Sequence, residues 1–324
     1  MLDLIEIEKR YEKIKPYLKE TPLEESLYLS DENTKAYLKL ECLQPVVRNF
    51  KLRGVLGKLS SLTEEQLQKG VATVSSGNQG VSLAYGAKLM GIPSPHIYAP
   101  NSTPLPKIHK MKHFGANLHL VGDDFDEANK IGTEEIKNNG YTFIDAREDP
   151  DGITGTASIG IEILERVPDT DAVIIPVGSG GDLTSNGSYF KQKKPDVKVY
   201  GVEVDFSPAL KTNLEENKWT RFFTNDRPDT IIGSLTGGCA KHTFDNYNKV
   251  CDGLLIVSEE EIRQAVYEMA QNEKVICEPD SAASYAAYKK YRELFENKKT
   301  ALYITGANIS SEVFDSIMKE NRKA

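Results

Sequence analysis

Short apolar segments alternate with longer amphipathic segments along almost the whole chain, and this alternation limits the possible folds more than any other feature. The helices expected between the strands include Gln79–Leu89, Phe125–Asn138, Ser158–Val167 and Glu259–Asn272. The strands expected from β-branched and apolar runs are Ala36–Leu40, Val71–Val74, His96–Ala99, Asn117–Val121, Ala172–Pro176, Lys198–Val202 and Ala301–Ile304. Strand–helix–strand alternation predicts parallel sheets with crossover helices, and therefore an α/β fold.

Two helix boundaries support this interpretation. Gly91 and Pro93 follow an apolar stripe that ends at Leu89, which is a typical helix end. Ser258 and Glu261 have the spacing of a capping box, which predicts that a helix begins there.

The composition excludes several classes of function. The chain has 324 residues, enough for two domains, with 39% hydrophobic residues and a formal net charge of -8. An acidic surface disfavours nucleic acid as a partner. The segment 1–17 is rich in Glu and Lys, and no apolar run approaches the roughly 18 residues that cross a bilayer. We therefore expect a cytoplasmic protein with neither a membrane nor a nucleic-acid partner.

The cysteines and histidines do not form a metal-ligand pattern. His109 and His113 are four residues apart, but no acidic residue lies between them, so we expect them on the surface. The cysteines have irregular intervals and are expected to be free, buried thiols: Cys42, Cys239, Cys251 and Cys277.

Two small-residue loops and one lysine are candidates for chemistry. Gly178-Ser179-Gly180-Gly181-Asp182 follows an expected strand, so it is either a tight turn or a cradle for phosphate. Ser75-Ser76-Gly77-Asn78-Gln79-Gly80 precedes an expected helix and suits either simple capping or a second anion such as a carboxylate. Lys51 is either a solvated surface lysine or, between Phe50 and Leu52, a partly desolvated nucleophile.

These motifs resemble those of the serine/threonine dehydratase and serine racemase family of fold-type II pyridoxal-phosphate (PLP) enzymes. The resemblance runs from Thr21-Pro22-Leu23 to Thr305-Gly306-Ala307-Asn308. It also includes Asn49-Phe50-Lys51-Leu52-Arg53-Gly54, the two loops above and Glu278-Pro279-Asp280-Ser281-Ala282. It implies a tryptophan synthase β-like fold with two doubly wound parallel-sheet domains. The large PLP-binding domain would comprise residues 1–69 and 149–324, and the small substrate-side domain residues 70–148, with the cofactor in a cleft between them.

The resemblance also implies how the cofactor is bound. Lys51 would carry PLP as a Schiff base, with Phe50 beside it. Asn78 would hydrogen-bond the ring hydroxyl, Thr305 would face the ring nitrogen, and Glu278 would line the pocket. The phosphate would be held by Gly178, Ser179, Gly180, Gly181 and Asp182.

On the substrate side, Ser76 stands where the racemases have their second acid/base. The residues implied to hold the substrate carboxylate are Ser75, Ser76, Gly77, Asn78 and Gln79. The expected partner is a small amino acid, and a homodimer is implied by the resemblance alone.

The expected reaction is loss of ammonia from a β-hydroxy amino acid such as L-threonine or L-serine, which gives a 2-keto acid. A hydroxyl at Thr305 does not stabilise a protonated ring nitrogen as a carboxylate would, so transamination is disfavoured and β-elimination stays accessible. Alternatives are a serine or aspartate-type racemase, a 3-hydroxyaspartate dehydratase and a β-replacing enzyme similar to cysteine synthase. A non-catalytic ligand sensor is a further alternative, which retention of Lys51 disfavours.

Departures from the family motifs lie on the substrate side. Asn49 replaces Ser, and Gln79 replaces His. Arg48 raises the hypothesis that a guanidinium binds a distal substrate carboxylate, as 3-hydroxyaspartate would offer. Glu203 matches the first ligand of the family's divalent-cation site, but Ala209 stands near the place of the second, so a cation is possible but not expected.

Overall fold

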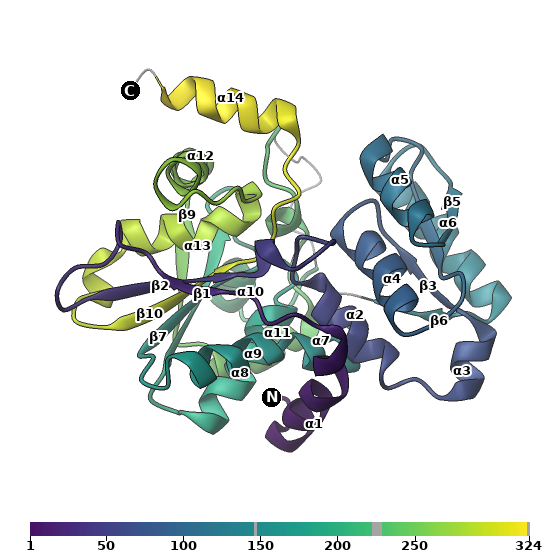
Figure 1. Cartoon of the computed structure of the whole chain (residues 1–324), viewed down its shortest axis with the longest axis horizontal. Coiled ribbons are helices and arrows are strands. Elements are labelled where there is room, and N and C mark those ends of the chain that lie inside the picture. Colours follow the sequence, from purple (N-terminus) through teal and green to yellow (C-terminus); the bar gives the residue numbers. More distant parts are fainter. Residues whose placement is uncertain (146–147, 222–228, 323–324) are drawn as a thin grey trace. The chain divides into compact units, whose positions relative to one another are not determined.

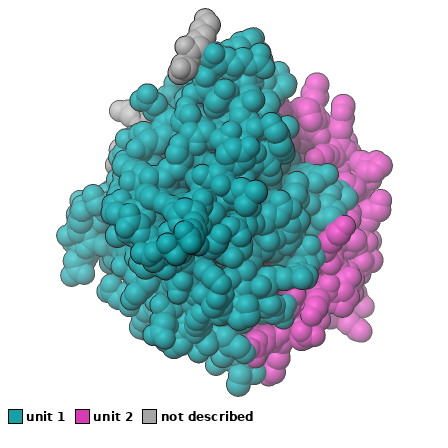
Figure 2. All heavy atoms as spheres, turned by 60° about the vertical axis from the view of Figure 1, so that its left-hand side comes forward, with its two compact units in different colours: residues 1–5, 20–50, 157–324 teal, residues 6–19, 51–156 magenta. Residues whose placement is uncertain are grey.

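The computed structural model of the chain describes residues 1–145, 148–221 and 229–322. Its contacts divide the chain into two compact units, coloured separately in Figure 2. Unit 1 comprises residues 1–5, 20–50 and 157–324, and unit 2 comprises residues 6–19 and 51–156. The division into domains at residues 70 and 148 stays a prediction.

Unit 1 contains a six-stranded sheet with the strand order β1-β2-β10-β7-β8-β9 (Figure 1). β1 pairs antiparallel with β2, and the other neighbouring strands run parallel. The strands are β1 (Leu23–Glu25), β2 (Lys35–Leu40), β7 (Ala172–Pro176), β8 (Lys198–Val204), β9 (Gly253–Val257) and β10 (Lys299–Ile304). All five residues of β7 are buried, as expected for a central strand with both faces covered.

The helices of unit 1 cover both faces of this sheet. α13 packs along β7, β8, β9 and β10, whereas α8 and α9 lie on the opposite face (Figure 1). α14 packs on α12. The helices are α8 (Ser158–Arg166), α9 (Gly181–Lys193), α10 (Ala209–Glu215), α11 (Lys241–Val250), α12 (Glu259–Glu268), α13 (Pro279–Lys290) and α14 (Ser311–Asn321).

Unit 2 contains a four-stranded parallel sheet with the order β5-β4-β3-β6. Its strands are β3 (Val71–Val74), β4 (His96–Ala99), β5 (Asn117–Leu120) and β6 (Thr142–Phe143). α6 packs on β3 and β4 over a core that contains Val74, Tyr98 and Ile136. The helices assigned mainly to this unit are α1 (Leu4–Ile14), α2 (Lys51–Leu59), α3 (Glu64–Lys69), α4 (Asn78–Leu89), α5 (Leu105–His113), α6 (Phe125–Asn139) and α7 (Pro150–Thr156).

The expected α/β fold with parallel sheets is confirmed, and each expected strand is present with its bounds shifted by at most two residues. The expected helix Glu259–Asn272 is α-helical only to Glu268 and continues as a π-helix over Met269–Glu273. The capping box of Ser258 and Glu261 is confirmed. The four cysteines are free and buried, as predicted. Over the described residues, every helix is too short or too polar to span a bilayer.

Candidate active site

The glycine-rich loop that follows β7 needs glycine for its backbone path. A Cβ on Gly178 would lie 2.5 Å from the Ser234 carbonyl oxygen. Gly180 has a left-handed φ of 85°, and a Cβ there would lie 2.3 Å from Cγ2 of Thr243. Any side chain at either position would therefore displace the loop from its neighbours.

The backbone of this loop presents hydrogen-bond donors. Among the described residues, no protein acceptor pairs with the N–H groups of Ser179, Gly180 and Gly181. The Ser179 carbonyl is held by the Ala240 N–H at 3.0 Å and by the Thr243 hydroxyl at 2.9 Å. Because α9 begins at Gly181, its N-terminal partial charge adds to these donors. This set of donors fits a phosphate group.

Thr305 directly follows β10, the strand beside β7, so it lies at the same carboxyl edge of the sheet as the glycine loop. It is buried, and its hydroxyl oxygen lies 2.9 Å from the hydroxyl oxygen of Ser281. Ser281 also accepts the Gly306 N–H at 2.6 Å. The Thr305 side chain is thus held in one orientation by a buried neighbour.

The segment before Lys51 pairs with the segment after β10. The Phe50 N–H donates to the Thr305 carbonyl at 3.0 Å, and Asn49 forms a β-bridge with Gly306. Glu278 lies against Gly306, where a Cβ would be 2.2 Å from Oε1 of Glu278. Glycine at position 306 therefore lets the Asn49 segment and Glu278 approach the end of β10.

Arg48 and Asn49 are the substrate-side departures that lie in this segment. Asn49 is fully buried and its side-chain amide donates to the Val47 carbonyl at 2.7 Å. Arg48 is exposed and has a left-handed φ of 56°. The hypothesis that Arg48 selects acidic substrates stays a prediction.

Lys51 is the first residue of α2 in unit 2 and is half-buried. The structure places it at a helix start, two residues after the β-bridge of Asn49 with Gly306. α2 packs on α4 through Val55 and Leu52, which lie next to Gly86. The orientation of Lys51 therefore depends on how α2 is held within its unit.

The loop between β3 and α4 also presents backbone donors. Ser75 is buried, and its hydroxyl accepts the Gly77 N–H at 3.1 Å. Gly77, the N-cap residue of α4, has no side chain that could accept a hydrogen bond from the first N–H groups of the helix. In the part of the chain that the structure describes, the N–H groups of Gln79 and Gly80 are not paired with a protein acceptor. The start of this 12-residue helix fits a carboxylate.

Lys107 of α5 (Leu105–His113) becomes a candidate only in the folded chain. Its ammonium nitrogen lies 3.9 Å from the position that a Cβ on Gly77 would occupy. A cation therefore stands beside the loop proposed for the substrate carboxylate. No sequence motif pointed to it, because the contact depends on how α5 packs on α4.

Asp280 and Ser281 stand in the recognised motif Glu278–Ala282, but the motif alone does not indicate their contacts. Asp280 accepts the Ser234 hydroxyl and the Leu235 N–H, both at 2.9 Å. Since the Ser234 carbonyl lies against Gly178, Asp280 helps to hold the neighbour of the glycine loop. The only sequence signal for Asp280 and Ser281 was their position in the recognised segment from Glu278 to Ala282.

Glu203 of β8 binds backbone N–H groups, unlike a carboxylate that binds a metal ion. Its carboxylate accepts the N–H groups of Leu210 at 2.7 Å and Lys211 at 2.9 Å, at the start of α10. Burial raises the pKa of Glu203 to about 7, although these two hydrogen bonds act in the opposite direction. The described residues contain no group of three or more His, Cys, Asp or Glu side chains placed to hold a metal ion.

Pyridoxal phosphate needs an amine for covalent attachment, donors for its phosphate and a partner for its ring nitrogen. The residue types present fit these needs: Lys51 would offer the amine, the N–H groups of Ser179–Gly181 would offer the donors, and Thr305 would offer a hydroxyl.

Comparison with known proteins points the same way. The chain is 32% identical to an L-threonine ammonia-lyase of Thermotoga maritima, over 99% of this chain and 79% of the relative. A threonine deaminase of Solanum lycopersicum has a similar structure, with a TM-score of 0.89, 29% identity and coverage of 98% and 94% of the two chains. A maize serine racemase matches with a TM-score of 0.89, 25% identity and coverage of 99% and 98%.

The profile of one protein family matches residues 14–306, which is most of the chain. That family is described as pyridoxal-phosphate dependent enzyme. The chain therefore belongs to the family of pyridoxal-phosphate dependent enzymes.

Proposed function

We propose that the protein is a PLP-dependent ammonia-lyase that converts L-threonine or L-serine to a 2-keto acid and ammonia. The observation that carries the proposal is the buried Thr305 hydroxyl, which Ser281 orients at the carboxyl edge of the sheet beside the glycine-rich loop. The names of the relatives from Thermotoga maritima and Solanum lycopersicum support the same activity.

The proposed reaction begins with proton removal. PLP, when bound, withdraws electrons from Cα of the amino acid. Once the substrate amine has displaced it from the cofactor, Nζ of Lys51 would take the Cα proton and pass a proton to the β-hydroxyl, which would leave as water. The released enamine takes up water and gives the keto acid and ammonia. The overall reaction turns one amino acid into one keto acid and one ammonia, so it needs no oxidant.

We assign the cofactor contacts as follows. Lys51 holds the cofactor covalently, and Phe50 lies beside it. Asn78 donates to the ring hydroxyl, and Glu278 lines the pocket. The phosphate is bound by Gly178, Ser179, Gly180, Gly181 and Asp182. A divalent cation is possible but not expected, because the Glu203 carboxylate already accepts two backbone N–H groups.

The amino-acid substrate is held by its carboxylate at the start of α4. The residues assigned to this carboxylate are Ser75, Ser76, Gly77, Asn78 and Gln79. In this proposal Thr305, and not a carboxylate, faces the ring nitrogen. A hydroxyl does not hold that nitrogen in its protonated form, and this favours elimination over transamination.

Racemisation is the second candidate function. It requires acid/base groups on both faces of Cα, and Ser76 would supply the second. Two observations favour it. Ser76 is half-buried in the loop assigned to the substrate carboxylate. The maize serine racemase matches over 99% of this chain. Racemisation would produce the D-amino acid without release of ammonia.

One assay separates these functions. Purified protein saturated with PLP is incubated with L-threonine, L-serine and 3-hydroxyaspartate, and keto acid, ammonia and D-amino acid are measured. We expect equal amounts of keto acid and ammonia with threonine or serine, and none with Lys51→Ala. Lys69→Gln is the control, because Lys69 forms an exposed ion pair on α3. D-amino acid without keto acid would favour the racemase, and no product would contradict both.

We further infer a cytoplasmic homodimer. The dimer rests on the family resemblance alone, and the compartment on the lack of a long apolar run in the sequence. Sedimentation of the purified protein tests the dimer, and a monomer at micromolar concentration would contradict it.

A further inference from the structure

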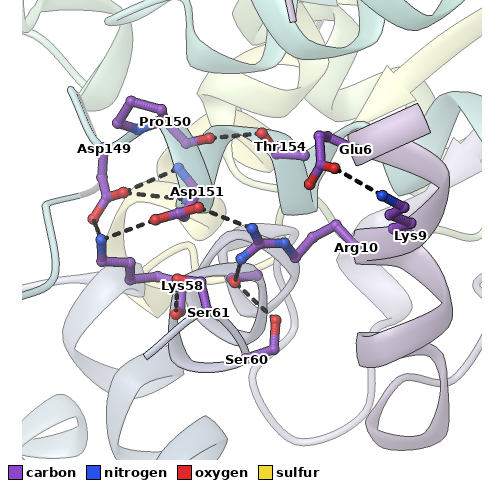
Figure 3. Close-up of polar contacts among 12 residues, drawn as sticks. Glu6, Lys9, Arg10, Lys58, Ser60, Ser61, Asp149, Pro150, Asp151 and Thr154 are labelled. Carbon is purple, nitrogen blue, oxygen red and sulfur yellow. Dashed lines mark hydrogen bonds and ion pairs between the residues drawn. The ribbon is translucent and has the colours of Figure 1, made fainter. Parts of the chain in front are cut away.

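The helix that begins at Lys51 is held by a partly buried network of charged side chains (Figure 3). Nζ of Lys58, near the end of α2, forms ion pairs with Asp149 at 3.1 Å and with Asp151 at 3.2 Å. Arg10 of α1 pairs with Asp151 at 2.9 Å and donates to the Gly57 carbonyl of α2 at 2.5 Å. Three segments far apart in the sequence therefore meet at the end of α2.

The charges in this network are mostly shielded from water. The side chains of Asp149 and Arg10 are 7% and 10% exposed, and that of Lys58 is 17% exposed. Burial alone would lower the pKa of Lys58, but its two aspartate partners outweigh this effect and raise it. Lys58 is thus a charged group held by two carboxylates, and its removal would take this cation away from the buried Asp149 carboxylate.

The same helix is in backbone contact with α7. A Cβ on Gly57 would lie 2.7 Å from Cα of Gly155, and a Cβ on Gly54 would lie 3.2 Å from the Gly152 carbonyl oxygen. These glycines are spaced by three residues on each helix, so each pair lies on one helix face. Because the backbones approach this closely, with only Thr156 Cγ2 also near Gly54, a displacement of α7 is passed to α2.

Lys58 is seven residues after Lys51, close to two helical turns, so both side chains lie on nearly the same face of α2. Gly54, which contacts α7, lies between them on that face. A rotation of α2 as a rigid body about its axis would turn Lys51 and Lys58 through the same angle. Fixing the Lys58 ammonium between two carboxylates fixes this rotation.

We propose that Lys58, held by Asp149 and Asp151, is a positioning residue that sets the direction of Lys51 by fixing the rotation of α2. The proposal rests on the proposed role of Lys51 as the lysine that carries PLP. Lys58 itself touches neither substrate nor cofactor in this account. Arg10 supports the arrangement from α1, because it binds both Asp151 and the Gly57 carbonyl.

The test compares Lys58→Gln, which removes the charge, with Lys58→Arg, which keeps it. Lys69→Gln is the matched control, because it removes an exposed lysine from an ion pair in the same unit. For each folded, PLP-saturated variant we measure kcat, KM, the circular dichroism of the cofactor band and the rate at which borohydride fixes PLP on Lys51. A merely structural role would lower the melting temperature and leave the last two unchanged.

For Lys58→Gln we expect a loss of about tenfold or more in kcat with little change in KM, because a small misplacement of a catalytic group is costly. The dichroism and the borohydride rate should change as well. Lys58→Arg should restore most of each value, and Lys69→Gln should match the wild type.

Wild-type kcat, dichroism and borohydride rate in folded Lys58→Gln would overturn the proposal. If Lys58→Gln does not fold, the same readouts on Asp151→Asn, whose side chain is 38% exposed, decide in the same way. The wild-type protein separates the two failures. PLP fixed on Lys51 in the wild type with no effect in the variants rejects only the positioning role, whereas absence of PLP from Lys51 rejects the proposed function and this inference with it.

Discussion

The hydroxyl oxygens of Ser281 and Thr305 lie 2.9 Å apart, and the two residues come from α13 and the end of β10. Ser281 also accepts the Gly306 N–H at 2.6 Å. Ser281 therefore joins the first turn of α13 to the segment that carries Thr305. It fixes the hydroxyl that we propose to face the ring nitrogen of the cofactor.

Replacement of Ser281 by Ala should disturb the cofactor as well as the fold. The buried Gly306 N–H would lose its acceptor, which costs about 1–3 kcal/mol, and Thr305 would lose its orienting partner. We expect a shift in the visible absorption of bound PLP and a several-fold lower kcat.

The control for this variant is Ser284→Ala on the same helix. The Ser284 hydroxyl is fully buried and donates to the Tyr303 carbonyl at 2.7 Å, so its loss should lower stability by a similar amount. The PLP spectrum should stay that of the wild type. Equal spectra for both variants would show that Ser281 has no specific link to the cofactor.

We expect the glycine loop to bind the phosphate only in the backbone conformation that it has in this structure. Gly180→Ala would force a side chain into a left-handed backbone and against Thr243, and the loop N–H groups would move. We expect the dissociation constant for PLP to rise about tenfold or more, which fluorescence titration measures, since each charge-assisted hydrogen bond contributes about 1.5–3 kcal/mol.

Gly115→Ala is the matched control for the backbone strain. Gly115 has a φ of 86°, close to that of Gly180, but open space surrounds its missing side chain. This variant should lose stability and keep the wild-type affinity for PLP. A similar loss of affinity in both variants would mean that strain, and not the loop, weakens binding.

Lys107→Gln should weaken substrate binding. The ammonium of Lys107 stands beside Gly77, so its removal takes a positive charge from the proposed carboxylate site. We expect KM for the amino acid to rise about threefold or more at low salt, less at high salt, with kcat nearly unchanged. Lys112→Gln, an exposed lysine on the same helix, should leave KM unchanged. An unchanged KM for Lys107→Gln would remove Lys107 from the site.

The buried Glu203 should make stability depend on pH. Its pKa is raised from 4.5 to about 7 by burial, so between these values the folded protein holds a proton that the unfolded chain releases. The free energy of unfolding should therefore fall as pH rises from about 4.5 to 7, by at most about 3 kcal/mol from this group. Urea unfolding at pH 5 and 7.5 measures it, and Glu203→Gln should flatten the trend. The same slope in both proteins would contradict the assignment.

The parts of the fold that the sequence predicted are those with a strong local pattern. β7 matches its expected bounds because a continuous apolar run of five residues is typical of a central parallel strand. β6 has only two residues, and β1 is a short antiparallel edge strand, so neither has a pattern long enough to be recognised. β9 was missed because a short apolar run does not by itself distinguish a strand from a buried helix.

The candidate site was predicted by family resemblance, and its supporting contacts were not. Lys51, Thr305 and the glycine loop stand in recognisable motifs. The partner of Thr305, by contrast, is 24 residues away, and the Asn49 segment bridges to Gly306 across most of the chain. Such contacts depend on the folded backbone, and no local pattern in one sequence encodes them.

The most direct test of the whole account is to identify the residue that holds PLP. The purified protein with PLP is reduced with borohydride, digested and analysed by mass spectrometry, with Lys51→Ala as the control. We predict one cofactor-modified peptide, labelled at Lys51, and no labelled peptide from the variant. Labelling at another lysine, or none after added PLP, would contradict the central claim.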